Sequence, residues 1–173
     1  MTAPRSGWPY ITMRWRGVSL PLCFLPLPSE RAELVRWFLL SQGEARAIYA
    51  DATAEGATEE SIERIDRASL LVEGSVGYLL MRMWAGPPSP TLARWLADAK
   101  TKESSEVAFP GPDHKLLAGR AFLNEIIEAT GLSYEDLVRV ARKVIETRPP
   151  VEPSGAEVEE VESFFGVTQD ATT

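Results

Sequence analysis

The first pattern along the chain is a strict alternation of apolar and polar residues. Its apolar members are Ile11, Met13, Trp15, Val18, Leu20 and Leu22. The alternation breaks only at Arg16-Gly17 and resumes in the same phase, which predicts a β-hairpin with a two-residue turn and positive φ at Gly17. Pro21 is then expected at a position that donates no hydrogen bond to the partner strand.

After the hairpin the spacing of apolar residues becomes helical. Ser29 is a candidate N-cap, and Leu34, Trp37 and Phe38 follow at spacings of three and four. This helix is expected to reach about Ser41, with Gly43 interrupting it and one or two further turns over 44–51. A second helix is expected after Thr58, which is its candidate N-cap. Its predicted apolar seam consists of Ile62, Ile65, Ser69, Val72, Val76, Leu79 and Met83.

Gly74 and Gly77 lie inside this second helix, where each costs about 1 kcal/mol relative to alanine. They indicate either close packing against another helix or a kink. The sequence Gly74-Ser75-Val76-Gly77 lacks the strand-turn-helix context of a nucleophile elbow, so close packing is the favoured interpretation.

Three shorter helices are expected next. Ser89, Asp113 and Ser133 stand at N-cap positions, Gly131 ends the middle helix, and Asp136 completes a capping box with Ser133. Their predicted apolar faces are Leu92, Trp95, Leu96 and Ala99; Leu116, Phe122, Leu123, Ile126 and Ile127; and Leu137, Val140, Ala141 and Val144. The sequence therefore predicts a mostly α protein, with an N-terminal β-hairpin packed on a five- to six-helix domain.

Charged residues are distributed unevenly along the chain. The net charge is −7 over 173 residues, but residues 149–173 hold six acidic residues and no basic ones, so the rest is close to neutral. We expect a flexible N-terminus over 1–7, a helical domain over 8–148, and a Pro-rich linker with a loosely attached acidic tail over 149–173.

Composition and motifs argue against most catalytic chemistry. One Cys and one His exclude an internal disulfide and make a metal site unexpected. Phosphate-binding glycine motifs are absent, as is an apolar run of 18 residues. Adjacent acids such as Glu59 and Glu60 point about 100° apart on a helix, which does not make an acid/base pair. We expect no enzyme activity, cofactor, metal or membrane span, and a cytoplasmic location.

Two single residues and one segment have competing interpretations. Cys23 is a possible nucleophile, but its apolar neighbours favour a buried thiol. His114 is a possible general base, and a surface histidine is the simpler interpretation. Residues 122–143 resemble a helix-turn-helix around Gly131, although Glu135 and Asp136 would repel phosphates where the second helix begins. A plain αα-hairpin is favoured there, and nucleic acid is an unlikely partner.

Candidate partner-binding residues lie near both ends. Trp8 precedes the predicted hairpin and is a candidate interface anchor. The tail carries an apolar set at helical spacing among glutamates, which is typical of a short docking helix. Its members are Val158, Val161, Phe164 and Phe165. This segment either binds a partner, folds back on the basic N-terminal half, or has no binding role.

Both ends of the chain resemble tail assembly chaperones of long-tailed bacteriophages. The resemblance rests on 11–22 (Ile-Thr-Met-Arg-Trp-Arg-Gly-Val-Ser-Leu-Pro-Leu), on 25–28 (Leu-Pro-Leu-Pro) before a helix, and on Arg148-Pro-Pro150 before an acidic tail. It implies a non-catalytic assembly factor that binds a helical tape-measure partner in the host cell cytoplasm, and no catalytic residue carries over. A virion head-to-tail adaptor and a DNA-binding regulator using 122–143 remain the alternatives, and the partner and oligomeric state stay open.

Overall fold

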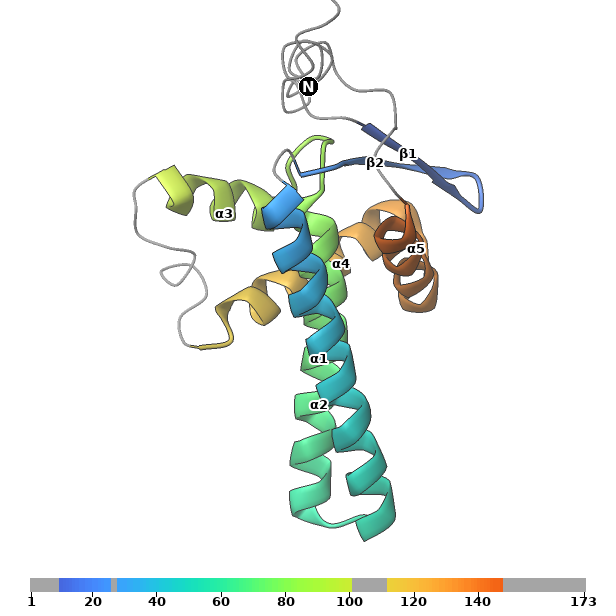
Figure 1. Cartoon of the computed structure of the whole chain (residues 1–173), viewed down its shortest axis with the longest axis vertical. Helices are drawn as coiled ribbons and strands as arrows, with labels where there is room; N and C mark the ends of the chain where they lie inside the picture. Colours follow the sequence, from blue (N-terminus) through green and yellow to red (C-terminus); the bar gives the residue numbers. More distant parts are fainter. Residues whose placement is uncertain (1–9, 26–27, 101–111, 148–173) are drawn as a thin grey trace, which may run out of the picture.

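The structure, a computed structural model, describes residues 10–25, 28–100 and 112–147. The described residues form two long helices, three shorter helices and a β-hairpin. In Figure 1 the long helices lie side by side, and the hairpin and the shorter helices gather around one end of the pair. The fold confirms the predicted mostly α protein with an N-terminal β-hairpin. The elements are β1 (Tyr10–Trp15), β2 (Val18–Cys23), α1 (Pro28–Glu55), α2 (Glu59–Arg82), α3 (Pro90–Lys100), α4 (His114–Thr130) and α5 (Tyr134–Glu146).

The hairpin has the predicted register, with Trp15 opposite Val18 across the turn. Arg16 and Gly17 both have positive φ, 47° and 81°, as a type I′ turn requires. Pro21 falls on a non-hydrogen-bonded pair with β1, as expected, and its carbonyl accepts from the Ala85 N–H at 2.7 Å. The chain leaving α2 therefore covers the outer edge of β2 and hides it from other strands.

α1 is one continuous helix of 28 residues, so the predicted interruption at Gly43 is wrong. Gly43 is exposed, and a Cβ there would meet nothing within 4 Å. The residues on either side of it, Phe38 and Ala45, are buried against the rest of the fold. Packing of the buried face outweighs the cost of about 1 kcal/mol for one glycine inside a helix.

The predicted seam of α2 is correct only in its second half. Val76 and Leu79 are fully buried, but Ile62 is 54% exposed. Near its start α2 instead buries Ser61, Ala68 and Leu71. Ala68 shares a small core with Ala45 of α1, so small side chains rather than the larger isoleucine lie between the two helices. The predicted cap at Thr58 is confirmed, with a reciprocal box to Ser61.

Glycines set the crossing of α2 and α4. A Cβ on Gly77 would overlap the carbonyl of Gly119, and a Cβ on Gly119 would overlap the carbonyl of Gly74. A Cβ on Gly74 would lie 2.5 Å from the carbonyl oxygen of Leu116. The two backbones therefore touch, which confirms that these glycines permit close helix packing.

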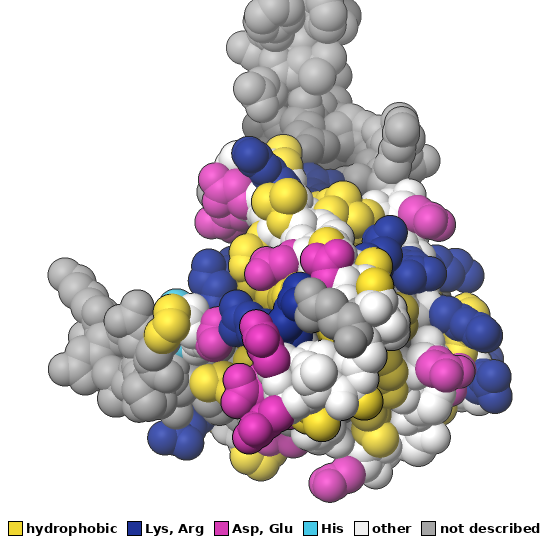
Figure 2. Space-filling view, turned by 90° about the horizontal axis from the view of Figure 1, so that it is seen from below, with side chains coloured by type: hydrophobic (Ala, Val, Ile, Leu, Met, Phe, Trp, Pro, Cys, Tyr) yellow, Lys and Arg dark blue, Asp and Glu magenta, His cyan; other side chains and the backbone are white. Residues whose placement is uncertain are grey.

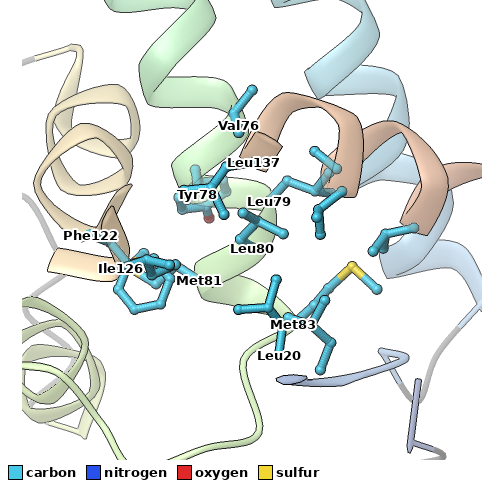
Figure 3. Close-up of a cluster of buried hydrophobic side chains, with 14 of the residues drawn as sticks. Leu20, Val76, Tyr78, Leu79, Leu80, Met81, Met83, Phe122, Ile126 and Leu137 are labelled. Atoms are coloured by element: carbon cyan, nitrogen blue, oxygen red, sulfur yellow. The ribbon is translucent and has the colours of Figure 1, made fainter. Parts of the chain in front are cut away.

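α2 is the centre of the main core, because α4, α5 and β2 all pack around its second half (Figure 3). Phe122 of α4 and Leu137 of α5 are fully buried there, and Trp84 meets Phe122 edge to face at 5.4 Å between centroids. Trp37, Trp84 and Trp95 are half-buried against this core.

The capping predictions for the last helices have mixed outcomes. Gly131 ends α4 with φ 73°, and Ser133 and Asp136 form the expected capping box on α5. Asp113 stands at the N-cap of α4, as predicted, but its side chain makes no capping hydrogen bond. Its carboxylate instead lies 2.6 Å from Nη1 of Arg67, linking α4 to α2. In the described part of the chain, no helix is long and apolar enough to cross a membrane.

Candidate interaction surface

An exposed apolar surface lies on α1. Leu39 and Leu40 are 52% and 63% exposed, and the other large hydrophobic side chain exposed to this degree among the described residues is Ile62. The two leucines border a shallow groove of about 610 Å³. Its lining residues are Pro28, Arg31, Ala32, Val35, Arg36, Leu39 and Leu40. We call this surface the outer face of α1.

The outer face continues along the helix with smaller residues. With about 100° between successive residues, Gly43, Ala47 and Ala50 fall on the same side as Leu39, and all three are exposed. The opposite side of α1 packs on α2 through Leu34, Phe38, Ala45 and Ala52, which are buried. α1 is therefore apolar on two opposite faces, only one of which the described fold covers.

Charge is sorted around α1 in the same way. The three arginines of the helix lie beside or within the outer face; they are Arg31, Arg36 and Arg46. Its acidic residues fall together on a third side of the helix. On the face seen in Figure 2, in contrast, acidic and basic side chains are interspersed among apolar ones. The outer face thus combines apolar contact with positive charge, which suits an acidic amphipathic partner.

A second hollow of about 620 Å³ lies between β2, α4 and the chain after α2. Polar groups that line it form hydrogen bonds within the fold. Nε1 of Trp84 donates to the Pro87 carbonyl at 3.1 Å. The Glu125 carboxylate accepts from the Thr91 N–H at 3.0 Å and from its hydroxyl at 2.5 Å, at the positive start of α3. These bonds hold α3 in place.

An aromatic cluster surrounds Tyr78. Its ring meets Trp37 and Trp95 edge to face, at 5.0 and 5.5 Å between centroids. Nη1 of Arg82 donates to the Tyr78 hydroxyl at 3.0 Å, and Nζ of Lys115 lies 5.9 Å from the ring centroid. The ring is 97% covered, so the cluster joins α1, α2 and α3 rather than presenting a recognition surface.

Cys23 and His114, the two candidate catalytic residues, lie on separate elements of the fold. Cys23 is buried at the end of β2, where its N–H donates to the Met83 carbonyl at 2.8 Å; its predicted burial is confirmed. His114 is half-buried at the first residue of α4 and stacks on Trp95 at 6.4 Å between centroids. Among the described residues, no group of three or more His, Cys, Asp or Glu is arranged to hold a metal ion.

The β-hairpin contacts the first turn of α5. The Asp136 carboxylate accepts from Nε1 of Trp15 at 3.0 Å and pairs with Nε of Arg16 at 2.9 Å. The Trp15 bond, followed by the Ser133 N–H bond, lowers the pKa of Asp136 to about 2. α5 follows α4 after the short turn 131–133 and packs mainly on α2 and β1. A first turn covered by β1 is also poorly placed to enter a DNA groove.

The five residues predicted to bind a partner all lie outside the described residues. They are Trp8, Val158, Val161, Phe164 and Phe165. Sequence reasoning missed the outer face of α1, although the spacing of Pro28, Ala32, Val35 and Leu39 is a helical signal. Comparisons with protein-family models, curated proteins and solved structures give no match to this chain.

Proposed function

We propose that this protein is a non-catalytic assembly factor of the phage tail-chaperone type, which binds a helical tape-measure partner through the outer face of α1. The observation that carries the proposal is the exposure of Leu39 and Leu40 on a helix whose opposite side is core. A long helix with a second apolar face is suited to a partner helix packed along it. The resemblance of both chain ends to tail assembly chaperones supports the partner class.

The size of the surface agrees with this partner. The outer face follows α1 from Pro28 to Ala50, and 22 steps of about 1.5 Å make roughly 33 Å of helix. A partner helix of about three heptads covers that length. Val35, Leu39 and Leu40 supply the large apolar contacts, and Arg36 with Arg46 favours glutamate or aspartate on the partner flanks.

The test is co-expression of the full chain with the tape-measure protein encoded in the same genome. We expect the wild-type chain to keep that protein soluble and to co-purify with it, and Leu39→Glu to lose both effects. Ile62→Glu is the matched control, because Ile62 is equally exposed but lies on α2. Equal behaviour of the two variants, no co-purification, or a genome without a tape-measure gene overturns the proposal.

A further inference from the structure

The end of the described chain lies beside the outer face of α1. Thr147, which follows α5, lines a small cavity together with Arg31 and Val35 of α1. The same two residues line the groove of the outer face. The segment beyond Thr147 therefore starts next to the apolar surface that the described fold leaves uncovered.

The sequence of that segment complements the surface. Residues 157–165 contain four glutamates and no basic residue, around an apolar set formed by Val158, Val161, Phe164 and Phe165. The groove offers Val35, Leu39 and Leu40 between arginines, and its lining contains no acidic residue. Apolar residues spaced three and four apart would meet an apolar stripe, and glutamates would meet Arg31 and Arg36.

The connection between them is long enough. Ten residues, 148–157, separate Thr147 from Val158, and eleven steps of about 3.3 Å give a maximal reach of roughly 36 Å. A tether of this length keeps the segment at an effective concentration in the millimolar range. A contact too weak to join two separate molecules is therefore sufficient within one chain.

We infer that residues 157–165 dock in cis on the outer face of α1 as an acidic amphipathic segment. They cover Leu39 and Leu40 until a partner displaces them. The docking stands without any partner, and only the displacement rests on the proposed function.

The test uses a Glu-specific protease on the full chain, with mass spectrometry following each cleaved bond. We expect cleavage after Glu157, Glu159, Glu160 and Glu162 to be at least fivefold faster in Leu39→Glu than in wild type. Cleavage after Glu152, outside the docked segment, should keep its rate and serves as an internal control. Ile62→Glu should change all of these rates less than twofold, because it alters an equally exposed residue away from the groove.

A second variant examines the contact from the other side. Phe165→Ser should accelerate cleavage after Glu157 as Leu39→Glu does, and the two changes together should add nothing further, because both break one contact. Equal rates in wild type and Leu39→Glu, or additive effects in the double variant, overturn the inference. Protection that disappears on tenfold dilution would place the segment on a second copy and overturn docking in cis. Since no partner is present, these outcomes are separate from failure of the proposed function.

Discussion

Asp136 accepts a hydrogen bond at 3.0 Å from the indole of Trp15, a residue 121 positions earlier in the chain. The same carboxylate caps α5 through Ser133 and pairs with Arg16 in the turn of the hairpin. One side chain thus caps α5 and holds the β-hairpin against it. The arrangement gives the carboxylate a role in stability that depends on its charge.

Asp136→Asn should therefore destabilise the protein in a pH-dependent way. The pKa of Asp136 is lowered from 3.8 to about 2 in the folded chain, first by the Trp15 bond, so folding favours the ionised form. The stability that this provides is fully present above about pH 4 and is lost as pH falls through 2. Urea unfolding midpoints of wild type and variant should differ most near pH 6 and converge towards pH 2. Glu135→Gln, an exposed change in the same turn, is the control, and a gap that stays constant with pH would contradict the assignment.

Gly77→Ala and Gly119→Ala should each destabilise the fold by at least about 2–3 kcal/mol, because the new methyl group meets backbone that has no room to move. Gly43→Ala is the matched control in a helix with open space around it. It should stabilise the protein by about 0.5–1 kcal/mol. Chemical unfolding measures all three, and a neutral Gly77→Ala would show that α2 and α4 do not cross at the glycines.

Leu79→Ala and Ile62→Ala compare two members of the predicted α2 seam. Leu79 is fully buried in the main core, so its truncation should cost about 2–5 kcal/mol. Ile62 is 54% exposed, and its truncation should change stability by no more than about 0.5 kcal/mol. If chemical unfolding shows similar losses of stability at both positions, Ile62 and Leu79 belong to one buried seam, as the spacing predicts.

The buried polar link between α1 and α2 predicts energetic coupling. Nε2 of Gln42 donates to Oγ of Ser75 at 2.8 Å, and both residues are buried. A double-mutant cycle with Gln42→Ala and Ser75→Ala should give a coupling free energy of about 1 kcal/mol. Thr53→Ala, combined with Gln42→Ala, should give none, because the Thr53 hydroxyl bonds only to carbonyls of its own helix. Strict additivity of Gln42→Ala and Ser75→Ala would reject the link.

Local signals account for the parts of the fold that the sequence predicts well. The hairpin turn at Arg16-Gly17, the cap at Thr58, the stop at Gly131 and the Ser133 capping box each depend on residues within one or two turns. The errors arise where a distant element decides. Asp113 pairs with Arg67 of another helix and makes no capping bond, and no local signal in the sequence shows this pairing.

The candidate site shows the same division. The sequence shows apolar residues at helical spacing on both the outer face and the buried face of α1. Spacing alone does not say which of these two faces a neighbouring helix covers. α2 settles this, because Ala45 of α1 shares a small core with Ala68 of α2, whereas Leu39 and Leu40 lie outside it.

The sequence by itself determined the hairpin and its turn, the order of the helices, most of their caps, and the concentration of negative charge in the last 25 residues. Only the tertiary structure decided that Gly77 and Gly119 meet, that Asp136 joins β1 to α5, and that the described fold leaves one apolar face of α1 uncovered. The physical reason is that turns and caps are satisfied by near neighbours, whereas burial depends on which surface a distant part of the chain covers.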